Sequence, residues 1–448
     1  MFGKLAATWV CTVLVILACG AMAEAPRESV AHRILEILHA DGTISDAQYR
    51  ELIALADAEV QARLQPPAVS AGNAVEVGYK DGFYMKTRDD QFKLQIGGRF
   101  MMDWALFHED SDVSQLLGEI GSGTEFRRAR LFAKGQLMEN VHFKFQYDFA
   151  GGDVDFNDVY LTFREVPVVG TVQVGHFKEP FGLEELTSSR FLTFMERSLP
   201  NVLVPGRNSG LGVHGGLAED RITWAVGAFR ETDSSGNGFG DDSTYNLTGR
   251  VTALPYRDAS GDHLLHVGLS YSHLFRNNDL ERFTAKPEAH LAPSFLDTGA
   301  FAADAIDLYN PELALVWGPF SAQAELTFAD VNRDGVRDAD LYGHYLMLSY
   351  FLTGESRAFK PAKAAFARLR PRRNFTRGKG RGAWEVAARY SMLKLSDAGL
   401  PGGDLRDVTV GVNWYLNPFV RIMFNYVNAD LNDVGRTNVW QTRFQADF

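Results

Sequence analysis

Cysteine is almost absent from this sequence. The chain has 448 residues, and its two cysteines, Cys11 and Cys19, lie within the first twenty. The remainder therefore has no thiol for a disulfide, a metal site or nucleophilic catalysis. No apolar run after residue 20 is long enough for a membrane-spanning helix. Acidic residues outnumber basic ones, and the formal net charge of −11 argues against a nucleic-acid partner.

The first 23 residues predict an export signal. Lys4 precedes an apolar run over residues 5–20, and residues 21–23 (Ala-Met-Ala) have the small side chains of a cleavage site. A retained membrane anchor is the alternative, but the run is short and no basic cluster follows it. Lipid attachment at Cys19 is a second alternative, which Leu17 fits poorly. We expect residues 1–23 to be a signal peptide that is removed on export.

Residues 24–73 predict a helical hairpin followed by a linker. Apolar residues recur at helical spacing in two stripes, Val30, Ile34, Ile37 and Leu38, then Leu52, Leu55 and Ala56. Between the stripes, Ser45 or the residue after it can cap the second helix. Residues 65–67 (Gln-Pro-Pro) begin the linker.

Residues 74–448 change to a two-residue period. In the run from Phe92, the apolar Leu94, Ile96 and Phe100 alternate with polar residues such as Gln95 and Arg99. This alternation fits a soluble sandwich with an apolar interior, and it equally fits a membrane barrel whose apolar face meets lipid.

Connection lengths decide between these two folds. About sixteen alternating runs follow one another from residue 92 to the end, with longer and shorter connections in turn. Long loops at one end and short turns at the other are typical of outer-membrane barrels. We therefore predict an all-β fold: a transmembrane antiparallel barrel of about 16 strands over residues 74–448, preceded by a short periplasmic helical hairpin.

In such a barrel the polar face of each strand lines the lumen, and this face is rich in base. The predicted cations of an anion pathway are Arg99, Arg128, Arg130, Lys134, Lys144, Arg164, Lys178, Arg190, Arg207, Arg250, Arg389, Arg421 and Arg443. Cations along a pore favour anions, and the guanidinium fork suits phosphate oxygens. The alternative is that these cations pair with lumen carboxylates and only brace the wall.

Two connections stand out. The segment 178–207 is long, polar and aromatic, and we expect it to fold into the pore as its third loop. The connection 353–382 lies where a short periplasmic turn is expected and is strongly basic. It either concentrates anions at the inner mouth or is a solvated basic tail. Its basic residues include Arg368, Arg370, Arg372, Arg373, Arg377 and Lys379.

Several motifs together resemble the phosphate-selective porin O and P family. They are residues 126–130 (Phe-Arg-Arg-Ala-Arg), 143–150, 178–189 (beginning Lys-Glu-Pro-Phe-Gly), 196–200 and 351–357. The resemblance covers roughly residues 90–448 and implies a homotrimeric outer-membrane channel for small anions, with a constricting third loop and a ladder of arginines. On the same resemblance, Arg128 and Arg130 belong to the ladder and Lys178 to the constriction. The constriction segment balances its cations with four glutamates, so a general or carbohydrate-type porin remains the alternative.

Other functions fit the sequence less well. An enzyme in a barrel needs a nucleophile with a nearby base, and Ser188 and Ser189 have no histidine close in sequence. An energy-coupled receptor needs a larger barrel and a globular plug. Asp330, Asn332 and Asp334 have calcium-loop spacing, but Leu341 replaces the expected glutamate and a simple turn fits as well. We predict no enzyme activity, no cofactor and no metal.

Overall fold

The computed structural model describes residues 30–64, 74–238 and 244–448. The chain divides into two compact units, residues 1–74 and 75–448. The predicted signal peptide and the predicted linker after residue 64 lie outside the described residues. In the described part of the chain, no helix is long and apolar enough to cross a membrane.

The first unit holds two helices, α2 (Val30–Ala40) and α3 (Asp46–Leu64), as predicted. Ser45 starts the second helix with a reciprocal cap. The amide of Gln48 donates to Ser45 Oγ (3.4 Å), and the amide of Ser45 donates to Gln48 Oε1 (3.0 Å). Such a capping box satisfies two amides that the helix itself leaves unpaired.

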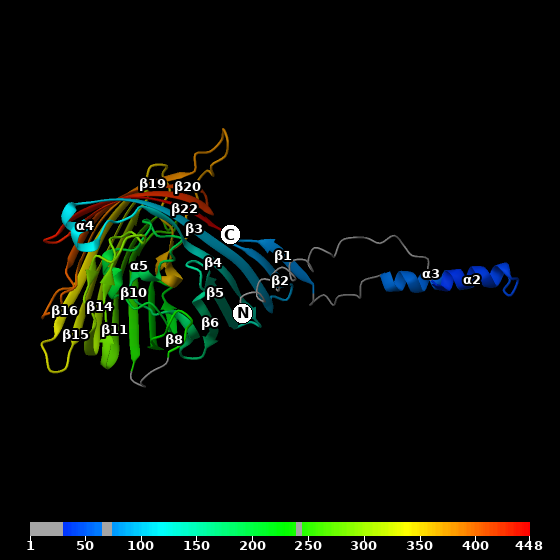
Figure 1. The fold of residues 1–448 in the computed structure, drawn as a ribbon. Coiled ribbons are helices and arrows are strands. Elements are labelled where there is room, and N and C mark those ends of the chain that lie inside the picture. Colours follow the sequence, from blue (N-terminus) through cyan, green and yellow to red (C-terminus); the bar gives the residue numbers. More distant parts are fainter. Residues whose placement is uncertain (1–29, 65–73, 239–243) are drawn as a thin grey trace. The chain divides into compact units, whose positions relative to one another are not determined.

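The second unit is a closed antiparallel barrel (Figure 1). Strand β22 pairs with β3 and closes the ring, so that Arg443 lies opposite Asp103. Among the described residues the ring has sixteen strands, which confirms the predicted fold class. In chain order they are β3 (Phe92–Glu109), β4 (Gly123–Leu137), β5 (Val141–Asp148), β6 (Asp155–Val166), β7 (Gly170–Lys178), β8 (Arg207–Leu217), β9 (Ile222–Arg230), β10 (Tyr245–Arg257), β11 (His263–Glu281), β14 (Phe301–Trp317), β15 (Phe320–Asn332), β16 (Ala339–Phe351), β19 (Ala383–Lys394), β20 (Asp404–Asn417), β21 (Val420–Leu431) and β22 (Gly435–Asp447).

Strand β16 shows why these residues form a barrel with an apolar exterior. Leu346, Leu348 and Tyr350 are 43–50% exposed on the outer face, whereas Tyr345 and Met347 between them are almost fully buried. Side chains of a strand alternate between its two faces. The outer face is therefore apolar over successive residues, as contact with lipid requires.

Shorter elements complete the second unit. The hairpin β1 (Val75–Tyr79) and β2 (Phe83–Thr87), which the sequence analysis did not predict, pairs with the start of β3. The remaining elements lie in connections: α4 (Ser111–Leu117), α5 (Leu183–Leu186), η2 (Leu199–Leu203), β12 (Thr284–Ala285), β13 (Leu296–Asp297), β17 (Phe359–Lys360), η3 (Pro361–Lys363) and β18 (Ala365–Phe366).

Several strands extend further toward the long-loop end than predicted. The connection between β21 and β22 spans only residues 432–434, where the alternation of connection lengths predicts one of the longer connections. Strands continue there because the ladder between Leu431 and Gly435 still pairs. The long-loop end is thus recognised mainly by the connections 110–122, 179–206, 231–244 and 282–300.

Candidate functional site

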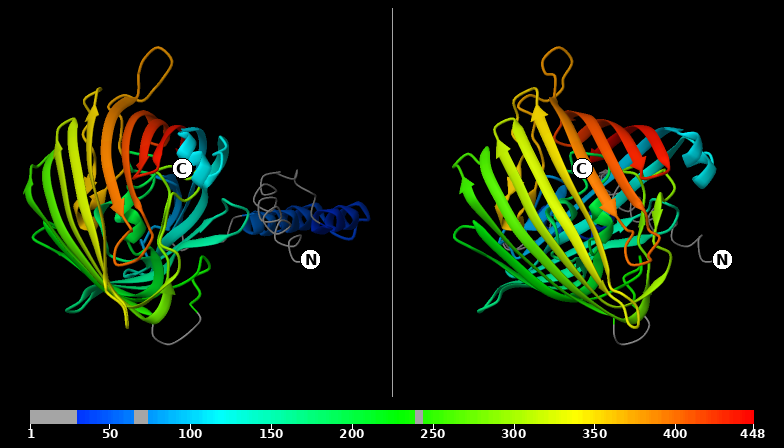
Figure 2. Two further views of the ribbon diagram at one scale, coloured as in Figure 1. Left: turned by 60° about the vertical axis from the view of Figure 1, so that its left-hand side comes forward. Right: turned by 90° about the vertical axis from the view of Figure 1, so that its left-hand side faces the viewer.

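The third loop, residues 179–206, lies against the lumen side of the barrel wall, and Figure 2 shows its green helix α5 within the ring of strands. Its apolar side chains are buried. Leu199 and Leu203 of η2 belong to one apolar cluster with Leu341 of β16, and Phe194 packs with Tyr345 and Met347 of the same strand. Apolar burial thus attaches the loop to one side of the wall.

Buried carboxylates also hold the backbone of this loop. Glu325 of β15 accepts hydrogen bonds from the amides of Leu183 (2.8 Å) and Glu184 (2.7 Å). Glu179 accepts from the side chains of Asn208 and Asn246, each at 2.7 Å. Burying a carboxylate without hydrogen-bond donors costs free energy, and several donors offset this cost.

Ion pairs connect the loop's own glutamates to basic residues. Glu196 binds Arg127 in a bidentate pair (3.0 and 3.1 Å) and Arg443 at 2.7 Å. Glu185 pairs with Lys178 (2.7 Å) and with Arg197 (3.0 Å). Burial alone would raise the pKa of Glu185, but the two cations outweigh it and lower this pKa to about 2.

A second connection, residues 282–300, also packs inside the barrel, which the sequence analysis did not predict. Glu288 pairs with Arg389 of β19 at 2.5 Å and accepts hydrogen bonds from Ser391 and Thr409. Its Ala289 and Ala292 join the apolar cluster that contains Leu199. The two loops together fill the side of the lumen formed by the later strands.

The opposite side of the lumen is open and strongly basic. A cavity of about 600 Å³, here called the basic cavity, lies between strands β3–β8, the third loop and the connection 353–382. Its lining includes Asp81 and Asp158 as its only acidic side chains among the described residues. Thirteen cationic side chains line it: Arg99, Arg127, Arg128, Arg130, Lys134, Lys144, Lys178, Arg190, Arg197, Arg207, Lys360, Lys363 and Arg368.

Arg127 reaches this cavity because of a β-bulge in β4. Met101 of β3 lies opposite Arg128, and the next residue, Met102, lies opposite Phe126, so Arg127 is the extra residue. A bulge puts two consecutive side chains on one face. Strict alternation instead predicts an outward Arg127. Phe126 and Leu131 both face outward although they are five residues apart. Strict alternation would put them on opposite faces, so this spacing of two apolar residues is the sign of the bulge in the sequence.

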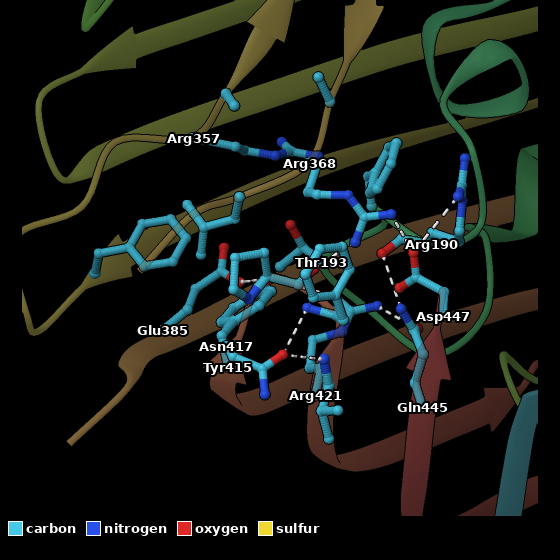
Figure 3. A pocket seen from close by; sticks show the side chains of 18 residues that line it. Arg190, Thr193, Arg357, Arg368, Glu385, Tyr415, Asn417, Arg421, Gln445 and Asp447 are labelled. Carbon is cyan, nitrogen blue, oxygen red and sulfur yellow. Dashed lines mark hydrogen bonds and ion pairs between the residues drawn. The ribbon is translucent and has the colours of Figure 1, made fainter. Parts of the chain in front are cut away.

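The basic connection 353–382 divides into two parts. Lys360, Lys363 and Arg368 line the basic cavity. Arg368 and Arg190 of the third loop both pair with Asp447 near the end of β22, the latter at 3.4 Å (Figure 3). The part beyond residue 370 is more exposed, and its basic side chains Arg372, Arg373, Lys379 and Arg381 line a separate cavity.

Two further cavities share side chains with the basic cavity. The long-loop cavity, about 440 Å³, shares Arg127, Arg130 and Arg207 with it and also contains Asp155 and His290. The short-turn cavity, about 340 Å³, shares Lys178 and Lys363 among others. The three cavities therefore follow one another along strands β3–β9.

The structure brings most of the predicted cations together. Eight of them line the basic cavity: Arg99, Arg128, Arg130, Lys134, Lys144, Lys178, Arg190 and Arg207. Arg164 and Arg250 line the short-turn cavity. Arg389, Arg421 and Arg443 do not line the basic cavity and are buried among carboxylate, amide and carbonyl oxygens. Whether any of these side chains contacts a passing anion stays a prediction.

The candidate calcium residues do not form a loop. Asp330 and Asn332 lie on strand β15, and only Asp334 is in the turn that follows. An extended strand cannot curl these oxygens around one ion. In the described ranges, no cluster of three His, Cys, Asp or Glu side chains is arranged to hold a metal.

Comparison with known proteins gives one family. A model of the family described as "Phosphate-selective porin O and P" matches residues 94–448. Porin O of Pseudomonas aeruginosa is 27% identical over 410 residues, which cover 82% of this chain and 90% of that protein. Among solved structures, an anion-selective porin from Comamonas acidovorans has a TM-score of 0.52 at 14% identity and covers 80% of this chain and 100% of its own. OmpT of Vibrio cholerae has a TM-score of 0.51 at 10% identity, with coverage of 80% and 98%.

Proposed function

The chain belongs to the phosphate-selective porin O and P family, and from this premise we propose that it is a passive channel for small anions, with phosphate and polyphosphate as its solutes. The family and the barrel indicate an outer-membrane channel rather than an enzyme. Residues 1–23 would be removed on export, the helical hairpin of residues 24–73 would lie in the periplasm, and residues 74–448 would form the channel as a homotrimer.

The basic cavity is the observation that carries this proposal. Thirteen cations line it, and six carboxylates neutralise them in part. Two of the carboxylates, Asp81 and Asp158, belong to the lining itself. Four carboxylates outside the lining form ion pairs with its cations: Asp148, Glu185, Glu196 and Asp447. An excess of fixed positive charge in a narrow, partly desolvated passage raises the local concentration of anions.

Five of these cations have no carboxylate within hydrogen-bond distance among the described residues. Arg99, Lys134, Lys360 and Lys363 make no ion pair with a carboxylate in the described part of the chain. Arg128 is 3.9 Å from Glu196, beyond hydrogen-bond distance. We assign these five side chains the main contact with anions, because a cation already bound to a carboxylate binds a second anion weakly.

The predicted cations outside the basic cavity have a different role in this proposal. Arg443 is 1% exposed and binds Asp103 through two hydrogen bonds of 2.7 and 2.6 Å. Arg389 binds Glu184 at 3.1 Å and Glu288 at 2.5 Å. We propose that these pairs brace the inward-folded loops, which narrow the pore and direct solutes to the basic side.

Reversal potentials of the purified full-length channel in planar bilayers under a potassium chloride gradient test the proposal. We expect chloride to be clearly more permeant than potassium, and added phosphate and polyphosphate to block the chloride current. Equal permeability of the two ions would overturn the proposal in favour of a general porin. Block by a neutral oligosaccharide with none by phosphate would favour the carbohydrate type instead.

A further inference from the structure

The short-turn cavity has an apolar wall, part of which it shares with the basic cavity. Phe177 of β7 and Phe229 of β9 line it and are 8% and 0% exposed, and Leu186 and Pro180 of the third loop complete this side. The Phe177 ring meets those of Phe229 and Tyr160 edge-on, with centroids 5.3 and 5.9 Å apart. Phe229 is fully buried and packs against Phe177, so Phe177 and Tyr160 are the rings that a ligand can contact.

Glycines in the neighbouring strands make room for the rings of Phe177 and Phe229. A Cβ atom on Gly212 would lie 3.3 Å from Phe177, and one on Gly227 would lie 2.5 Å from Phe229. The two rings therefore lie closer to the neighbouring backbone than a side chain at these positions would readily allow. At about 340 Å³ the cavity lies within the range of small-molecule sites, which are mostly apolar with a few charged groups.

The same cavity has two paired cations and two that lack an ion pair among the described residues. Lys178 and Arg250 are paired, with Glu185 at 2.7 Å and Glu312 at 2.5 Å. Arg164 and Lys363 also line the cavity, and neither makes an ion pair with a carboxylate among the residues that the structure describes. A ligand there meets an aromatic surface on one side and unpaired positive charge on the other.

We propose that the short-turn cavity binds organic anions in which a carboxylate is attached to an apolar ring, that is, aryl carboxylates in transit through the channel. A bare inorganic anion leaves the aromatic surface in water, and a neutral apolar ligand leaves the cations unused. An aryl carboxylate satisfies both, and the shared residues Lys178 and Lys363 pass it to or from the basic cavity. This inference rests on the proposed function and names a second class of solute for the same pathway.

Block of the chloride current by benzoate and by acetate tests the inference on the full-length channel. Both probes are monoanionic carboxylates, so a difference between their half-blocking concentrations measures the contribution of the aromatic ring. Burial of about 60 Å² of ring surface favours benzoate roughly tenfold. We expect half-block at a benzoate concentration about tenfold below that of acetate. Equal half-blocking concentrations would overturn the proposal.

A pair of variants places the effect in the cavity. In Phe177→Ala, the half-blocking concentration of benzoate is expected to lie within about twofold of that of acetate. Phe163→Ala, on the outer face of the adjacent strand β6 and 37% exposed, is the matched control and should keep the tenfold preference. Because Phe177 also lines the basic cavity, Pro180→Ser in the third loop, which lines the short-turn cavity but not the basic cavity, is the second variant. A folded variant at either position that retains the full preference would contradict the assignment.

Failure of this inference is distinguishable from failure of the proposed function. A channel that prefers chloride to potassium but does not distinguish benzoate from acetate refutes only the aryl carboxylate site. A channel without preference for chloride refutes the anion pathway itself, and the inference with it.

Discussion

Replacing Arg99 by glutamine removes a positive charge from the lining of the basic cavity. Arg99 extends from β3 into the basic cavity, where its guanidinium contacts Ser188 Oγ at 3.4 Å and its Nε atom has no hydrogen-bond partner. No carboxylate in the described part of the chain forms an ion pair with it. We expect Arg99→Gln to lower anion selectivity and to leave the fold intact.

The magnitude follows from Coulomb's law. Two unit charges 4 Å apart interact by about 1 kcal/mol in water and by about 4 kcal/mol at an effective dielectric constant of 20. The lower value applies to a hydrated lumen, and about 1 kcal/mol is roughly a fivefold change in an equilibrium constant. The chloride-to-potassium permeability ratio should therefore fall about fivefold, measured from reversal potentials. The loss should shrink at high salt as screening replaces the fixed charge.

Arg443→Gln is the contrasting variant. Arg443 is also buried but is ion-paired, and its removal leaves Asp103 without its cation and Glu196 with one cation fewer. Breaking a buried ion pair from one side costs roughly 3–5 kcal/mol. We expect this variant to lose its compact form on electrophoresis at a clearly lower heating temperature, with a smaller change in selectivity than Arg99→Gln. An unchanged permeability ratio in a folded Arg99→Gln channel would refute the division into conducting and bracing cations.

Three other outcomes are expected. Burial, and next the ammonium groups of Lys144 and Lys360, lower the pKa of Lys363 to about 8. This side chain is charged below pH 8 and neutral above it, so the preference of the channel for chloride should decline as the pH rises from 7 to 9. The decline should be smaller in Lys363→Gln. Replacing Arg370, Arg372 and Arg373 by serine should lower anion preference without lowering thermal stability, and unchanged reversal potentials would make the outer part of this connection a solvated tail. Cross-linking of the folded protein in detergent should give a trimer as the largest defined species, and a monomer alone would contradict the proposed assembly.

Local pattern in the sequence, together with the lengths of the connections, was enough to predict the fold. Alternation places Leu346 and Leu348 on the outside and Met347 between them on the inside, whatever the rest of the chain does. Helical spacing likewise separated α2 and α3 from the strands. These periods depend on backbone geometry within a few residues, so a single sequence contains them.

Strand alternation also predicted which cations face the lumen. It missed the places where the strand is irregular or short. Arg128 and Arg130 follow the alternation and line the basic cavity, but the bulge at Arg127 adds a neighbour that strict parity places outside. The hairpin β1–β2 was missed because its two strands are only five residues each. A pattern so short carries little periodic signal.

Only the tertiary structure decided which cations remain unpaired. Arg99 and Arg443 are the same residue type on the lumen side of adjacent strands, yet one is without a carboxylate and the other binds two. Glu196 reaches Arg443 from a loop that lies 247 residues earlier in the chain. Strand alternation determines which way a side chain points, but the loops that fold back into the lumen determine what it meets there, because their contacts join residues far apart in sequence.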